Sequence, residues 1–144
     1  MCYRVYISTD SDDDLSKRNS VLVHFEKLTD TNAGSCTQLL GFPNKWYVGS
    51  KSECSCTFRH LISIELGFGE PEDWCEEEQD NLDATKELYR TLNYLLSSGH
   101  KVDLVDQWYD IKPEDITTLD VSLDEVSESA FIMFENHKFR LKKR

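Results

Sequence analysis

The chain lacks a long apolar run. None of its 144 residues falls in a stretch of the roughly 18 apolar residues that a membrane-spanning helix needs, and no repeat or long linker divides it. The first residues lead directly into a strand-like pattern without an apolar leader, so we expect neither a signal peptide nor membrane attachment. These absences predict a single domain over residues 1–144, located in the cytoplasm.

Basic residues are scarce. The chain holds 16 Lys and Arg against 27 Asp and Glu, a formal net charge of −11, and five of those bases lie in the last seven positions, 138–144. A surface this acidic repels phosphate backbones and anionic lipids. We therefore expect no nucleic acid and no membrane as a partner, and instead a basic protein or a cationic ligand.

The five cysteines cannot all pair within the chain, because their number is odd (Cys2, Cys36, Cys54, Cys56 and Cys75). In the cytosol such cysteines are kept as reduced thiols. A chain of this length buries roughly 68% of its unfolded surface, which is enough to fold without a disulfide or a metal. The sequence therefore predicts neither a structural metal nor a cofactor.

The apolar pattern predicts an α+β fold. Alternating apolar residues indicate strands at 3–8, 21–25, 45–49, 54–66, 101–108 and 119–123, and a terminal hairpin of 130–134 with 138–141. One long helix is predicted from about Asp73 to Ser97, with Gly99 placed to cap its end. We expect a mostly antiparallel sheet of about six to eight strands packed against this helix. Residues 122–125 also fit a capping box for a short helix.

The segment from Cys54 to His60 is the best candidate for chemistry. In an extended chain, Cys54, Cys56 and His60 share one face, and thiolates with imidazole suit either a zinc ion or an activated thiol. A flat strand holds the two cysteines nearly 7 Å apart at their roots, by a rise of about 3.3 Å per residue. Zinc would need a bend and a further ligand from Cys36 or Cys75. We favour packing cysteines, because free Cys is among the most buried residue types.

An acidic segment precedes and enters the predicted helix. Residues 70–87 contain nine acidic residues, a single lysine and one tryptophan. An aromatic anchor among acids is a plausible face for a basic partner; its candidate residues are Trp74, Glu76, Glu77 and Asp80. The competing interpretation is that Trp74 packs the helix start onto the core while the acids stay in water.

Three functions follow from these features, and whether the protein is an enzyme stays open. The first is a non-enzymatic binding or regulatory protein for a basic protein or cationic ligand. The second is a small thiol-dependent enzyme or redox protein that uses Cys54 or Cys56 with a histidine. The third is a zinc-stabilised domain.

Overall fold

The computed structural model describes residues 3–29, 33, 36–51, 55–61, 67–70 and 78–143. Its regular elements are β1 (Tyr3–Thr9), β2 (Val23–Lys27), β3 (Asn44–Ser50), β4 (His60–Leu61), α1 (Gln79–Ser97), β5 (Val102–Trp108), β6 (Thr117–Ser122), β7 (Met133–Phe134) and β8 (His137–Lys142). Six strands form one sheet in the order β2-β3-β1-β5-β8-β6, and β4 pairs with β7 separately. The predicted α+β class is confirmed.

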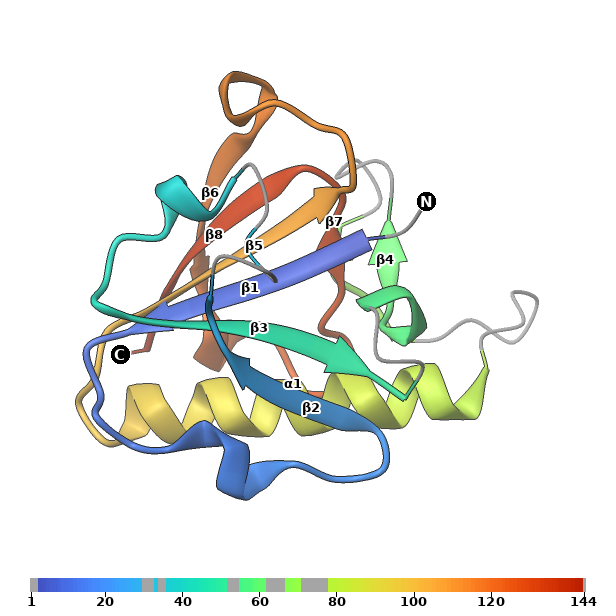
Figure 1. The fold of residues 1–144 in the computed structure, drawn as a ribbon. Coiled ribbons are helices and arrows are strands. Elements are labelled where there is room, and N and C mark those ends of the chain that lie inside the picture. The colour runs from blue at the N-terminus through green and yellow to red at the C-terminus, as the bar shows by residue number, and fades with distance from the viewer. Residues whose placement is uncertain are drawn as a thin grey trace.

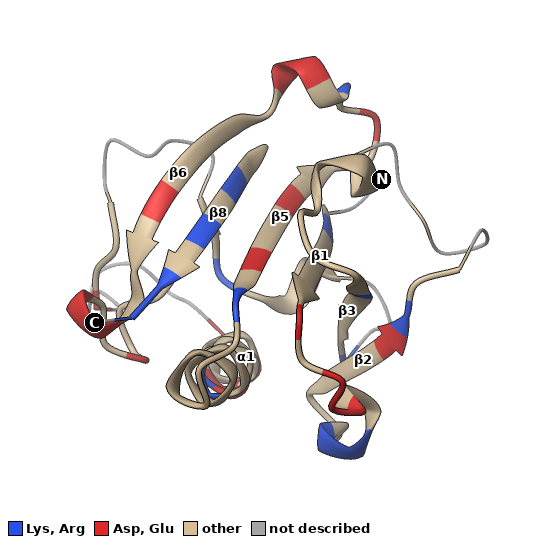
Figure 2. Ribbon diagram, turned by 90° about the vertical axis from the view of Figure 1, so that its left-hand side faces the viewer, with Lys and Arg blue, Asp and Glu red and all other residues tan. Residues whose placement is uncertain are grey.

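The six-stranded sheet arches over α1, which lies along one face (Figures 1 and 2). Its neighbouring strands are antiparallel except β6 and β8, which run parallel. The helix buries Leu88, Leu92 and Leu95 completely, against sheet residues that include Val5 and Leu104. The predicted apolar face of the helix is therefore confirmed, and it forms the main core.

The helix begins at Gln79, later than the predicted start at Asp73. Glu78 has extended backbone angles (φ −67°, ψ 139°) and its side chain makes no capping hydrogen bond; residues 71–77 lie outside the described residues. The predicted end is confirmed. Gly99 adopts a positive φ of 87°, and His100 N donates to the carbonyl of Leu95 at 3.0 Å, closing the last turn in the way glycine permits.

The strand predicted from Cys54 onward is wrong for residues 55–59. Residues Ser55–Thr57 form a turn of 3-10 helix, and among the described residues of this segment only β4 is a strand. The Ser55 hydroxyl accepts a hydrogen bond from Val5 N at 2.8 Å and donates one to the Val48 carbonyl at 2.6 Å. Because this hydroxyl bridges β1 and β3, the chain turns there, and the shared strand face inferred for Cys56 and His60 does not form. Residues 62–66 lie outside the described residues.

The predicted terminal hairpin is also wrong. Strand β7 pairs in parallel with β4, whereas β8 lies between β5 and β6. The turn contains Asn136 at a φ of 60°, and the Asn136 Oδ1 accepts a hydrogen bond from Trp108 N at 2.8 Å. Through this turn, the chain passes from the small sheet (β7) to the large one (β8). In the ambiguous segment, β6 ends at Ser122 and a turn of 3-10 helix, Leu123–Glu125, follows it.

The other face of the sheet is covered by the connection between β2 and β3. Cys36 and Leu40 pack there with Tyr6 and Val105. The buried carboxylate of Asp103 accepts hydrogen bonds from Ser8 Oγ on β1 and, at 2.8 Å, from Gly41 N of the connection, while Phe42 N donates to Ser8 Oγ at 3.2 Å. A side chain at position 41 would place its Cβ 3.2 Å from that carboxylate, so the close approach favours glycine.

Candidate functional site

His60 is fixed by hydrogen bonds at both ring nitrogens. Its Nδ1 lies 2.7 Å from Asp106 Oδ2 and its Nε2 lies 2.6 Å from the Ser55 carbonyl oxygen. The ring of Tyr3 stacks on the imidazole, with centroids 3.9 Å apart and planes 7° from parallel. The His60 side chain is only 5% exposed and that of Asp106 is fully buried. This group is a polar cluster inside the protein.

The strand register explains why these residues meet. Asp106 on β5 lies opposite Val5 on one side and His137 on the other. Tyr3 precedes Val5 by two residues, so both point to the helix side of the sheet. The turn at Ser55 then returns the chain, and β4 places His60 over Asp106.

The geometry of His60 and Asp106 calls for a hydrogen between them. A carbonyl oxygen only accepts, so His60 Nε2 carries a hydrogen and donates it to Ser55. The short contact between Nδ1 and the carboxylate needs one more hydrogen, carried by either His60 or Asp106. Burial alone lowers the pKa of His60, but the charge and hydrogen bond of Asp106 outweigh it and the pKa is raised. Burial raises the pKa of Asp106, with His60 opposing. No donor among the described residues reaches Asp106 Oδ1, which further disfavours a lone carboxylate.

Tyr3 is held in its protonated form. Burial, followed by a hydrogen bond to Glu135 and the negative charges of Glu135 and Asp106, raises the pKa of Tyr3 well above its usual range. A phenol with this environment donates a hydrogen bond and does not act as a base near neutral pH. The Tyr3, His60 and Asp106 side chains therefore form a packed polar network.

The structure places the predicted thiol residues in different surroundings. Cys54 lies outside the described residues, whereas Cys56 is partly exposed in the 3-10 turn and interacts electrostatically with Tyr3. Both His60 nitrogens are already engaged, so the imidazole has no nitrogen directed at the Cys56 thiol. General-base activation needs such a nitrogen within hydrogen-bond reach.

The residues proposed as zinc ligands are not brought together where they are described. Cys36 is buried on the sheet face opposite the helix, while His60 lies on the helix side. Cys75, like Cys54, falls outside the described residues. Within residues 3–143 as far as they are described, no three His, Cys, Asp or Glu side chains lie where they could hold a metal ion.

The predicted acidic binding face can be followed only at Asp80. Trp74, Glu76 and Glu77 lie outside the described residues. The carboxylate of Asp80 lies 2.5 Å from Lys51 Nζ, and both side chains are about half exposed. Such a surface pair joins the first turn of α1 to the end of β3, and contributes little to stability.

A second group of acids lies at the two ends of β6, the strand at one edge of the large sheet. Glu114 and Asp115 lie in the 3-10 turn before the strand, and Asp124 and Glu125 in the turn after it. All four side chains belong to exposed residues. Figure 2 shows acidic segments at both ends of this strand. We call these residues the β6 end acids.

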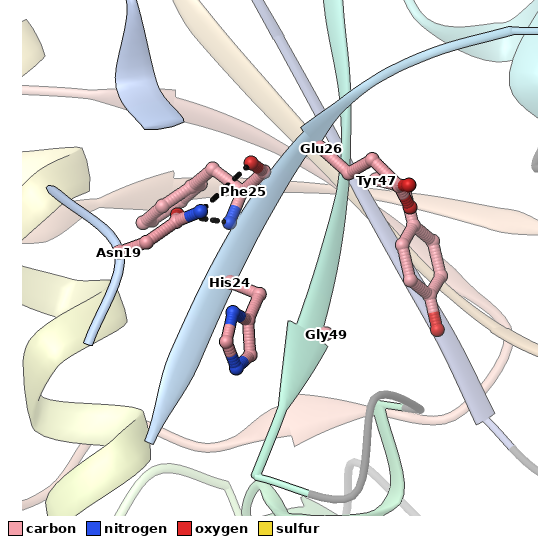
Figure 3. A pocket seen from close by; sticks show the side chains of 6 residues that line it. All are labelled: Asn19, His24, Phe25, Glu26, Tyr47 and Gly49. Carbon is pink, nitrogen blue, oxygen red and sulfur yellow. Dashed lines mark hydrogen bonds between the residues drawn. The ribbon is translucent and has the colours of Figure 1, made fainter. Parts of the chain in front are cut away.

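A hollow of about 340 Å³ lies beside β2, the opposite edge strand (Figure 3). It is lined by Asn19, His24, Phe25, Glu26, Tyr47 and Gly49. His24 and Glu26 are exposed, and they point away from the helix side that Val23 and Phe25 occupy. This hollow is therefore separate from the cluster around His60.

Sequence reasoning missed Asp106 and Tyr3, although one signal was present. Asp103 and Asp106 interrupt the apolar strand β5, in which residues 102–107 are all buried. A carboxylate in the centre of a buried strand needs a partner, and the histidines were the available candidates. The end acids were missed because the sequence does not state which strand lies at a sheet edge.

Comparison with models of protein families, with curated proteins and with solved structures found no match to this chain. In the part of the chain that the structure describes, no helix is both long and apolar enough to span a membrane.

Proposed function

We propose that this chain is a non-enzymatic binding protein for a basic partner. The observation that carries the proposal is the position of the β6 end acids. Glu114, Asp115 and Asp124 are exposed, and none of them forms an ion pair within the described residues. Exposed, unneutralised carboxylates of one sign attract a partner of the opposite sign and raise its rate of association.

Two other surface acids near β6 and α1 are already neutralised by arginines. Asp120 makes two hydrogen bonds to the guanidinium of Arg140, at 2.7 and 2.9 Å. Glu128 pairs in the same two-pronged way with Arg90, at 2.9 and 3.0 Å. Because these arginines satisfy their own carboxylates, Asp120 and Glu128 are less able to attract a cation than Glu114, Asp115 and Asp124.

The surroundings of His60 support binding over thiol-dependent catalysis. A catalytic cysteine needs a base that can take its proton, and the histidine nearest to Cys56 in sequence uses both nitrogens elsewhere. His60 is also too buried to meet a substrate.

The test is calorimetric titration with a peptide of about ten lysine residues, at low and at physiological ionic strength. We expect binding that weakens with salt, and none to the corresponding glutamate peptide. The variant E114Q/D115N/D124N should lose most of the affinity. The matched control E26Q/E78Q/D83N changes the net charge equally and should lose much less.

Two results would overturn the proposal. One is the absence of lysine-peptide binding even at low ionic strength. The other is an equal loss in the two triple variants, which would make the attraction a property of net charge alone.

A further inference from the structure

Among the described residues, none pairs with the outer edge of β6. Thr117 N donates to the Asn136 carbonyl at 3.2 Å, and β6 continues in parallel register with β8. In a parallel ladder, alternate residues direct both main-chain groups to the same neighbour. Thr117, Leu119 and Val121 therefore face β8, whereas the main-chain groups of Thr118, Asp120 and Ser122 face away from the sheet.

The other edge of the sheet is covered by side chains. Asn19 Oδ1 accepts a hydrogen bond from Phe25 N at 2.6 Å, and Asn19 Nδ2 donates to the Phe25 carbonyl at 3.5 Å (Figure 3). Ser20 does the same for Val23: Ser20 N donates to its carbonyl at 2.9 Å, and Ser20 Oγ accepts from its N–H at 3.3 Å. These contacts imitate an additional strand and protect β2.

No described residue covers β6 in this way, and Thr118 and Asp120 are exposed. An open edge strand is a template for pairing with another chain, which proteins usually block. In the part of the chain that the structure describes, the β2 edge is blocked and the β6 edge is not. The difference indicates that β6 is kept available for a partner.

We propose that the outer edge of β6 pairs with an extended, basic segment of a partner protein, which adds a strand to the sheet. This inference rests on the function proposed above and specifies how the partner docks. Main-chain hydrogen bonds to Thr118, Asp120 and Ser122 supply affinity, as in other complexes formed by strand addition. Basic side chains at the ends of the segment meet the β6 end acids.

The charges favour such a segment over a second copy of this chain. Two β6 strands paired antiparallel about a two-fold axis would set Glu114 and Asp115 of one copy against Asp124 and Glu125 of the other. Like charges at both ends oppose that dimer. The centre of β6 is close to neutral, because Arg140 satisfies Asp120. The complementary segment is therefore basic at its ends and neutral and β-branched in its middle.

A peptide built to that pattern, Lys-Lys-Val-Thr-Val-Thr-Val-Lys-Lys, is the probe. It should bind more tightly than the lysine peptide, and N-methylation of alternate central residues should weaken it at least about tenfold. On the protein, Thr118→Pro removes only an N–H that points outward, which an edge strand tolerates. We expect the Thr118→Pro protein to bind the designed peptide at least about tenfold more weakly, and the lysine peptide with unchanged affinity.

Amide hydrogen exchange supplies a second measurement. The Thr118 and Asp120 amides should exchange fast in the free protein and slow down when the designed peptide binds. Phe25 N–H, already bonded to Asn19, serves as the internal control and should not change.

The outcomes separate the two proposals. If the designed and lysine peptides bind but neither N-methylation nor Thr118→Pro weakens the former, docking at β6 is wrong while binding of a basic partner stands. If neither peptide binds, both proposals fall. N-methylation acts on the peptide alone, so the test holds even if Thr118→Pro prevents folding. If the free protein self-associates and the designed peptide prevents this, the edge instead pairs with a second copy of the chain.

Discussion

His60 Nδ1 and the carboxylate of Asp106 lie 2.7 Å apart, buried beneath the ring of Tyr3. The contact joins two elements that are far apart in the sequence, the short strand β4 and the central strand β5. A buried ionisable pair of this kind costs solvation and is tolerated only while each partner satisfies the other. Its protonation therefore links the stability of this region to pH.

Stability should fall as the pH rises above neutrality. The folded protein raises the pKa of His60 above its ordinary value of 6.5, so the pair stabilises fully below about pH 6.5 and loses this contribution as the pH rises through the folded pKa. Urea unfolding between pH 6 and 9 should show a slope of at most about 1.4 kcal/mol per pH unit from this pair. The double variant H60Q/D106N, which lacks the proton, should remove that component.

The variant Asp106→Asn should reverse the sign of this dependence. An asparagine amide can donate to Nδ1 of neutral His60, but it cannot neutralise a buried imidazolium. Burial then lowers the pKa of His60, and stability should drop as the pH falls below about 6.5. Asp120→Asn, which breaks the exposed pair with Arg140, is the control and should leave the wild-type pH profile in place. An unchanged profile in Asp106→Asn would show that the pair is not the titrating group.

Leu92→Ala should destabilise the protein by about 2–5 kcal/mol, because it opens a cavity where α1 meets the sheet. Ser97→Ala, at an exposed position of the same helix, should have a much smaller effect. Denaturant unfolding of both variants gives the comparison. Wild-type stability in Leu92→Ala would contradict the assignment of this face to the core.

Local pattern was enough to predict most of the elements, and long-range contacts explain the failures. The periodicity of Leu88, Leu92 and Leu95 and the glycine at 99 predict α1 and its end, because those signals act within a few residues. The turn at Ser55 depends on a hydroxyl that bonds β1 and β3, some 50 residues away in one case. The separation of β7 from β8 likewise depends on β4.

The candidate site was less predictable for the same reason. His60 was singled out with Cys54 and Cys56 by their closeness in sequence, but its partners are Tyr3 and Asp106 on two other strands. The charge pattern predicts a basic partner, and this stays a prediction. The strand order is needed to see that four of the acids flank an edge strand, β6.

Replacing His60 should have little effect on the reactivity of Cys56. In a protein that keeps Cys56 as its only cysteine, we expect the rate of alkylation near pH 7 to be similar with His60 and with His60→Gln, since neither imidazole nitrogen is free to activate the thiol. The comparison is made where both proteins are folded. Cys36, which is fully buried, should react far more slowly in the matching single-cysteine protein. A large loss of Cys56 reactivity in His60→Gln would restore the thiol-enzyme alternative.

Asn19→Ala should uncover the β2 edge and make the protein prone to self-association. The substitution removes the side chain that bonds both main-chain groups of Phe25, at a cost of about 1 kcal/mol in stability. The exposed N–H and carbonyl are then free to pair with another chain. Light scattering at increasing protein concentration should show larger species for Asn19→Ala than for the wild type. Asn19→Asp keeps the acceptor for Phe25 N–H but loses the donor, so the size of its species should lie between those of the wild type and Asn19→Ala. If Asn19→Ala stays as dispersed as the wild type, the side chain does not protect this edge, and the contrast between β2 and β6 loses its meaning.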